Sequence, residues 1–206
     1  MKEAYIPRVT EGLEIDWENI PKIPIDLLVM TASTEVKAFA RICYSDSALF
    51  LQLAASESEI RAVETDLLGQ PCQDSCLEFF FCPMEGDNRY FNMEFNPNTC
   101  LFLGFGSGIQ NLTRLIPQDS DWVNSLFHPV VTRQTDGWNI TYQIPYQFIR
   151  RFFPNFKAAP GHTIRANFYK CADLASSPHY LSWNPITGTE GSVFHAPHDF
   201  GLLRFA

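Results

Sequence analysis

The stretch QPCQDSCLEFFFCPMEGDNRYFNMEFN, from Gln70 to Asn96, contains two apolar runs separated by a turn. The runs at 77–81 and 89–96 are short and rich in aromatic residues, as β-strands are. The residues between them, PMEGDN at 83–88, are of types that form turns. This pattern predicts a β-hairpin, and similar patterns recur along the chain.

Residues 36–56 contain two alternating runs joined at Ser45-Asp46-Ser47, which predicts a second hairpin. Only YQFIRRFF at 146–153, which stops at Pro154, predicts a helix. We therefore expect an all-β fold, a β-sandwich formed by a single domain over residues 1–206. The remaining expected strands are 99–106, 128–134, 137–144, 162–171 and 200–206.

The composition is that of a globular protein, with 46% hydrophobic and 18% charged residues in a chain of 206. A net charge of −8 argues against nucleic acid and against an anionic membrane as partners. No apolar run has the ~18–20 residues that a membrane-spanning helix needs. The start, MKEAYIPRVTEG, lacks the apolar core of a signal peptide, so we expect a cytoplasmic protein. Nothing in the sequence indicates an oligomeric state.

Three of the six cysteines, Cys72, Cys76 and Cys82, lie within the opening stretch. Structural zinc sites usually combine two close pairs of Cys or His, and no second pair follows this one. In a reducing compartment thiols stay free, and a thiol in a strand behaves as a small apolar group. We therefore interpret these cysteines as structural thiols.

Carboxylates in the same stretch are the candidates for a functional site. Alternation along the second run places Asn92, Glu94 and Asn96 on one face of the strand. Glu78 interrupts the first run, and an even hairpin register places it opposite Asn92 or Glu94. Two interpretations stay open: an ordinary solvated sheet face, or a surface whose carboxyl and amide groups bind sugar hydroxyls.

The motifs DSCLEFFF, RYFNMEFN, WNITYQIPY, RANFYKC, LSW and FHAPHDFGLLRF occur in an order that resembles the family 9 carbohydrate-binding modules. The resemblance extends from about Val36 to Ala206, and includes the stand-alone, family 9-like carbohydrate-binding proteins of bacteria. It implies a β-sandwich with jelly-roll character. It also implies binding of the ends of glucan and xylan chains, often with calcium as a structural ion.

The resemblance also implies site residues. Glu78 matches the glutamate with which the family bonds sugar, and Asn167 matches an asparagine on a neighbouring strand. Asn92 falls where the family has an amide, whereas Glu94 falls where it has a basic residue. These four side chains are the expected hydroxyl-binding groups.

The family holds sugar between two tryptophans, and those positions fall at Cys72 and Phe194. Phe194 can stack on a sugar ring, but Cys72 cannot replace an indole. His195 is expected at the rim of the site. Trp183, close in sequence to both, is either a core residue or a substitute stacking platform.

The predicted function is non-catalytic saccharide binding linked to polysaccharide or oligosaccharide catabolism. One alternative is a glycoside hydrolase that uses Glu78 and Glu94, although two carboxylates on one hairpin would approach the sugar from the same side. Another is a protein-interaction module that has lost sugar binding. No cofactor is required; for calcium the sequence offers only scattered aspartates and no dense acidic loop. These aspartates are Asp46, Asp66, Asp74 and Asp87.

Overall fold

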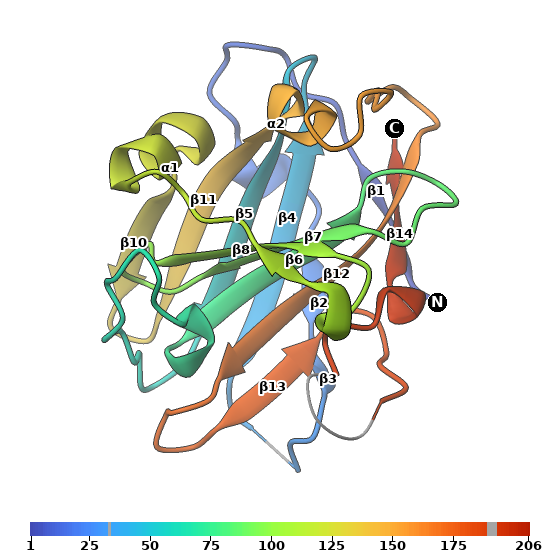
Figure 1. Ribbon diagram of the computed structural model, residues 1–206. Coiled ribbons are helices and arrows are strands. Elements are labelled where there is room, and N and C mark those ends of the chain that lie inside the picture. Colours follow the sequence, from blue (N-terminus) through green and yellow to red (C-terminus); the bar gives the residue numbers. More distant parts are fainter. Residues whose placement is uncertain (33, 189–192) are drawn as a thin grey trace.

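The computed structural model of the chain describes residues 1–32, 34–188 and 193–206. In these residues, two β-sheets pack face to face, which confirms the predicted β-sandwich (Figure 1). The larger sheet contains β1 (Glu3–Ile6), β3 (Leu27–Leu28), β6 (Cys76–Cys82), β7 (Tyr90–Phe95), β8 (Leu101–Gly106), β9 (Thr113–Arg114), β12 (Thr163–Ala172), β13 (His179–Ser182) and β14 (Gly201–Phe205). The smaller sheet contains β2 (Ile23–Ile25), β4 (Lys37–Tyr44), β5 (Ala48–Ser56), β10 (Val130–Gln134) and β11 (Gly137–Pro145).

The main path of the larger sheet runs β1-β14-β12-β6-β7-β8-β9, and the smaller sheet runs β10-β11-β5-β4-β2. β13 pairs with the end of β12 and carries β3 on its other edge. β1 and β14 pair in parallel, so both chain ends lie on one side of the molecule (Figure 1). In the same view, β6, β7 and β12 cross in front of β4 and β5.

Both predicted hairpins are confirmed. β4 and β5 pair Tyr44 with Leu49 across the Ser45-Asp46-Ser47 turn. β6 and β7 pair Glu78 directly with Glu94. The expected strands at 99–106, 128–134, 137–144, 162–171 and 200–206 correspond to β8, β10, β11, β12 and β14.

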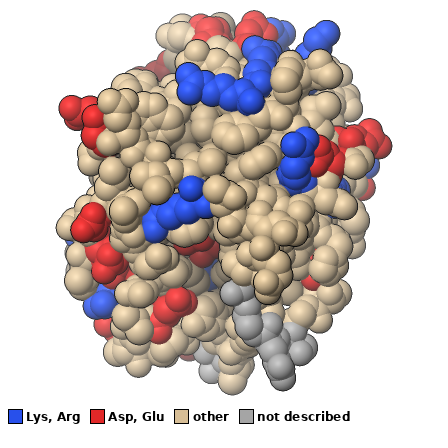
Figure 2. All heavy atoms as spheres, in the orientation of Figure 1, with Lys and Arg blue, Asp and Glu red and all other residues tan. Residues whose placement is uncertain are grey.

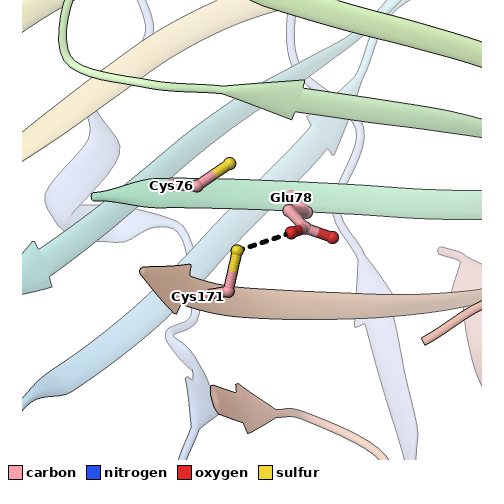
Figure 3. A group of neighbouring side chains, drawn as sticks. All are labelled: Cys76, Glu78 and Cys171. Atoms are coloured by element: carbon pink, nitrogen blue, oxygen red, sulfur yellow. Dashed lines mark hydrogen bonds between the residues drawn. The ribbon is translucent and has the colours of Figure 1, made fainter. Parts of the chain in front are cut away.

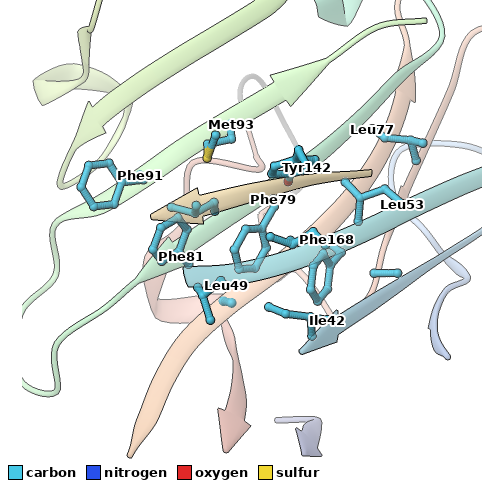
Figure 4. Packing of buried hydrophobic residues seen from close by; sticks show 14 of the residues in the cluster. Ile42, Leu49, Leu53, Leu77, Phe79, Phe81, Phe91, Met93, Tyr142 and Phe168 are labelled. Carbon is cyan, nitrogen blue, oxygen red and sulfur yellow. The ribbon is translucent and has the colours of Figure 1, made fainter. Parts of the chain in front are cut away.

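Alternation along the strands builds the core between the sheets. Phe79 and Phe81 of β6 point inward, as do Phe91 and Met93 of β7, where they meet aliphatic side chains of the smaller sheet such as Leu49 (Figure 4). The stacked pair Phe79 and Phe81 has ring centroids 4.8 Å apart. Inward residues of β6 are therefore committed to the core, and the residues between them face outward.

Two helices are present in the described residues, α1 (Ser120–Phe127) and α2 (Tyr146–Arg150). α2 confirms the predicted helix, although it ends three residues before the predicted limit. α1 was not predicted, because its apolar face is short. An N-cap marks the start of α1: the Asp119 side chain accepts a hydrogen bond of 2.7 Å from the Trp122 amide. Within the described ranges, short 3₁₀ turns lie at Trp17–Asn19, Pro71–Gln73, Ile109–Asn111 and Pro197–Asp199. No described helix is long and apolar enough to cross a membrane.

A buried ion pair lies at one end of the sandwich. Lys170 of β12 is fully buried, and its Nζ lies 3.0 Å from Oε2 of Glu57. The indole Nε1 of Trp138 donates to Oε1 of Glu57 at 2.7 Å, and His179 lies beside the same carboxylate. Charge in an apolar setting is expensive to desolvate, so each partner depends on the other.

The outer face of the larger sheet is also apolar over part of its area. A second cluster of buried residues includes Phe80 and Tyr90, which point away from the core, and the segment 193–200 packs on them. The segment 193–200 therefore covers part of the outer face of the larger sheet and partly encloses it.

Candidate functional site

A cavity of about 240 Å³ opens on this outer face. In the space-filling view of the same side, uncharged residues make up most of the surface and some acidic atoms lie recessed between them (Figure 2). The cavity is lined by Met30, Cys72, Glu78, Glu94, Cys171, Asp173, Tyr180, Val193, Phe194 and His195. It therefore contains four of the seven side chains that the sequence predicts for the site.

Two carboxyl groups form its floor. Glu78 on β6 and Glu94 on β7 are directly paired across the strands, so their side chains leave the sheet on the same face. Only 2% of Glu78 and 7% of Glu94 is exposed. The even register predicted for the hairpin is the reason that these two groups meet.

The hydrogen bonds of the floor leave acceptors unused. Glu78 Oε1 accepts from the thiol of Cys171 at 2.9 Å, as Figure 3 shows, and Asn92 Nδ2 donates to Glu94 Oε1 at 2.9 Å. Glu78 Oε2 and Asn92 Oδ1 are buried and have no partner among the described residues. Because a buried polar atom without a partner is costly, these two atoms indicate a place for a ligand that donates hydrogen bonds.

Both carboxyl groups hold protons more tightly than free ones. Burial, and then the neighbouring Glu94, raise the pKa of Glu78 well above its ordinary value. Burial raises the pKa of Glu94 to about 7, with Asp173 adding to the effect and the hydrogen bond from Asn92 opposing it. Near neutral pH the pair therefore retains protons and can both donate and accept hydrogen bonds.

This raised pKa predicts a pH dependence of stability. The pKa of Glu94 is about 7 in the folded protein and 4.5 in the unfolded reference, so its contribution is fully present below pH 4.5 and is lost as the pH rises through 7. The loss is roughly 3 kcal/mol of the free energy of unfolding, since one pKa unit corresponds to about 1.4 kcal/mol. Urea unfolding between pH 4.5 and 8.5 should show this fall in the wild type and a flatter profile in Glu94→Gln.

The control for that comparison is Glu85→Gln, because Glu85 is exposed in the turn between β6 and β7. Its profile should match the wild type. If Glu94→Gln also matched the wild type, the raised pKa of Glu94 would be refuted.

Aromatic side chains form one wall of the cavity. Phe194 stacks on Tyr169 with ring centroids 4.1 Å apart and planes 9° from parallel, and the Tyr169 hydroxyl donates to the Phe194 carbonyl at 3.0 Å. The Phe194 ring is therefore held in place where it lines the cavity. His195 lies 2.7 Å from the Tyr90 hydroxyl through Nδ1. Burial lowers its pKa to about 4, so the ring is neutral at pH 7.

Thiols lie beside the carboxyl groups. All six cysteines are free. Cys76 and Cys171 are paired across β6 and β12, next to Glu78 (Figure 3), and Cys72 lines the cavity from the turn Pro71–Gln73. The hydrogen bond with Cys76, and then burial, raise the pKa of Cys171, and burial raises that of Cys76. These thiols are thus protonated and polarisable, and they are not thiolates that would bind a metal ion.

Three of the seven predicted side chains do not line the cavity: Asn92, which bonds the lining residue Glu94, and Asn167 and Trp183, which have partners elsewhere. Asn167 Oδ1 accepts from the amides of Phe168 and Asn184, and its Nδ2 donates to the Asn184 carbonyl. All its polar groups thus fix the chain after β13. Trp183 is 2% exposed and packs on Phe168 in the core, with ring centroids 5.8 Å apart. The core interpretation of Trp183 therefore fits its position, and neither Asn167 nor Trp183 is available to a ligand in the cavity.

Five lining residues were missed by the sequence analysis: Met30, Cys171, Asp173, Tyr180 and Val193. They come from three segments far apart in the chain. Asp173 reaches the site because its backbone amide donates to the Cys72 carbonyl at 2.9 Å, which fixes the end of β12 against the turn Pro71–Gln73. No local pattern marks these positions.

The aspartates considered for calcium already have partners. Asp74 Oδ2 accepts from the amides of Val63 and Glu64 and from Asn96, while Asp46 binds Arg8 and Asp87 binds Arg89. Calcium takes six to eight oxygen ligands, and the described aspartates form no such group. The aspartates named from the sequence therefore do not form a calcium site in the described part of the chain.

A sandwich of two sheets that presents carboxyl and amide acceptors beside an aromatic wall is typical of a carbohydrate-binding module. Residues 10–205 match the family model described as Carbohydrate-binding family 9. The chain belongs to this family, whose members bind carbohydrate without catalysis and need no cofactor for it. No curated protein sequence matched the chain.

Solved structures agree with this assignment. A protein from Bacteroides uniformis ATCC 8492, described as a "putative carbohydrate-binding protein", has 26% identity and a TM-score of 0.82, and the match covers 100% of this chain and 99% of that one. A family 9 module from Caldicellulosiruptor kristjanssonii in complex with glucose has 16% identity and a TM-score of 0.68, covering 100% and 96%. A family 9 module from the same organism in complex with cellotriose has 15% identity and a TM-score of 0.68, and the match covers 99% of this chain and 93% of that one. At these low identities the two modules show the shared fold.

Proposed function

We propose that the cavity on the larger sheet binds one end of a saccharide, without cleaving it. The observation that carries this proposal is the buried Glu78 Oε2, which has no partner among the described residues and lines the cavity together with the ring of Phe194. Asn92 Oδ1, also buried without a partner, belongs to the side chain that bonds the lining residue Glu94. Sugar hydroxyls donate hydrogen bonds to such atoms, and the apolar face of a sugar ring packs on an aromatic side chain.

The size of the cavity supports a chain end rather than a long segment. Its volume of about 240 Å³ is below the ~300–1,000 Å³ typical of sites for drug-sized ligands, so it suits one or two sugar units. The glucose and cellotriose complexes of the family 9 module support a saccharide as the ligand class. A role in polysaccharide or oligosaccharide catabolism is part of this proposal.

The placement of the carboxyl groups supports binding without catalysis. Glu78 and Glu94 stand side by side on the floor, on neighbouring strands. Glycoside hydrolysis with retention needs one carboxyl group behind the anomeric carbon and another beside the leaving oxygen. Two groups that approach from the same side do not supply that arrangement.

A thermal-shift screen with neutral and charged mono- and oligosaccharides tests the proposal. At 100 times its Kd a ligand adds ~2.7 kcal/mol to stability, and each kcal/mol moves the Tm of a domain this size by ~2–4 °C. We expect a rise of roughly 5–10 °C with the binding sugar, and a much smaller rise in Phe194→Ala. Phe39→Ala, which removes a half-buried ring from the smaller sheet, should respond as the wild type does. A screen in which no sugar raises the Tm would refute the proposal and favour a protein-interaction module.

A further inference from the structure

The cavity has an unusual balance of charge for a site that binds sugars. Glu78, Glu94 and Asp173 contribute three carboxyl groups to its lining. The other lining residues are uncharged or, in the case of His195, neutral at pH 7. No lysine or arginine among the described residues lines the cavity.

The two cations that act on the floor carboxyl groups, Arg114 and Lys170, have other interaction partners. Arg114 donates to the carbonyls of Leu68 and Gly69 and lies over the ring of Phe102, 4.5 Å from its centroid. Lys170 points from the opposite face of β12 and pairs with Glu57. Each favours the charged form of one carboxyl group, Arg114 that of Glu94 and Lys170 that of Glu78, but neither forms an ion pair with it in the described structure.

Two buried atoms lack partners here among the described residues: Asn92 Oδ1 is an acceptor, and Glu78 Oε2 becomes one when its carboxyl group loses its proton. The amide nitrogen of Asn92 is used by Glu94, which leaves Asn92 Oδ1 and Glu78 Oε2 free and fully buried. A ligand that brings hydrogen-bond donors and positive charge complements the carboxylate form of this site. An ammonium group brings three donors, no acceptor and a positive charge, so it complements both the unused acceptors and the three carboxyl groups.

Resting on the sugar-binding function proposed above, we propose that the cavity selects sugars that carry a free, protonated amine, and disfavours sugars that carry a carboxylate. The amine lies on the floor between Glu78 and Glu94, and the sugar ring packs against Phe194. Hydrogen bonds in which both partners are charged are roughly twice as strong as neutral ones, so the amine decides the selectivity. A uronic acid would add a fourth carboxyl group to the same cavity and would be repelled.

The raised pKa of both floor carboxyl groups is consistent with this selectivity. In the free protein, burial raises the pKa of Glu78 and of Glu94, with Glu94 adding to the effect on Glu78 and Asp173 adding to the effect on both. A bound ammonium group stabilises the carboxylate forms, so protons leave the floor as the ligand enters. Asp173, half-buried at the edge of the cavity, adds to the negative potential.

Titration calorimetry of the full chain with four matched sugars tests the inference. The probes are D-glucosamine, N-acetyl-D-glucosamine, D-glucose and D-glucuronate, at pH 7.0 with EDTA present so that no metal ion mediates binding. An amine beside electron-withdrawing groups, like an α-amino group with a pKa of ≈ 7.7–8.0, is mostly protonated there. We expect glucosamine to bind at least tenfold more tightly than glucose or the N-acetyl form, and glucuronate at least tenfold more weakly than glucose.

Variants separate charge from shape. Glu94→Gln keeps the size of the side chain and should reduce the preference for glucosamine over glucose to about threefold or less. Glu85→Gln makes the same change of net charge on an exposed turn and should leave the preference intact.

The outcomes distinguish this inference from the function on which it rests. If glucose binds as tightly as glucosamine, or if Glu94→Gln keeps the full preference, the inference is wrong while saccharide binding stands. If none of the four sugars binds and the wider thermal-shift screen is also negative, both proposals fail.

Discussion

Replacing Glu78 with alanine is expected to weaken sugar binding by roughly 10- to 100-fold, because a buried hydrogen-bonding group that loses its partner costs ≈ 1–3 kcal/mol and each 1.4 kcal/mol is a factor of ten. Glu78 lies at the centre of the floor, where its Oε2 has no partner among the described residues. Isothermal titration with the sugar that gives the largest thermal shift measures the loss.

The same substitution should leave the fold intact. Glu78 is 2% exposed, and burial penalises its charged form, so its removal relieves a desolvation cost. The thiol of Cys171, which donates to Glu78, keeps the Cys72 carbonyl as an acceptor. We expect the Tm to stay within ~2–4 °C of the wild type, the effect of about 1 kcal/mol.

Two further variants make the Glu78 result decisive. Glu78→Gln keeps one acceptor and should retain part of the affinity, whereas Glu85→Ala on the exposed turn should keep all of it. Full affinity in Glu78→Ala would mean that the saccharide binds elsewhere on the protein. A collapse of the Tm in Glu78→Ala together with full affinity in Glu78→Gln would show that Glu78 supports the sheet rather than the ligand.

The second large effect is expected at the buried ion pair. Lys170→Met should lower the free energy of unfolding by about 3–5 kcal/mol, because it leaves the Glu57 carboxylate buried without its cation. Chemical denaturation measures the change. Since Lys170 points away from the cavity, sugar affinity in the folded fraction should be unchanged.

The double variant Glu57→Gln with Lys170→Met should recover most of that loss. Glutamine keeps an oxygen for the Trp138 indole, which now bonds Glu57 at 2.7 Å, and the charge without a partner is gone. The exposed pair of Arg204 and Glu3 is the comparison, and breaking it with Arg204→Met should matter little, as exposed ion pairs stabilise weakly. If the double variant were less stable than Lys170→Met, the loss would come from packing around the lysine stem and not from the orphaned charge.

The sequence by itself determined the strands and their faces. Alternation at 77–81 and 89–96, with turn residues between, predicts a hairpin in which Glu78 and Glu94 share a face, and the two groups are directly paired. These features could be predicted because a strand repeats every two residues and a hairpin turn fixes the register. β3 and β9 escaped prediction because two residues show no periodicity, and the eight residues of α1 make only about two helical turns.

Only the tertiary structure decided which of these residues form a site. Asn167 has a suitable residue type and lies on a neighbouring strand, yet its polar groups bond the backbone that follows β13. Trp183 packs in the core. Met30 and Asp173 reach the cavity from segments that no pattern connects to it. Periodicity is a local property of the chain, whereas a cavity and its unused hydrogen-bond acceptors depend on which distant segments cover a sheet face and on which donors those segments bring.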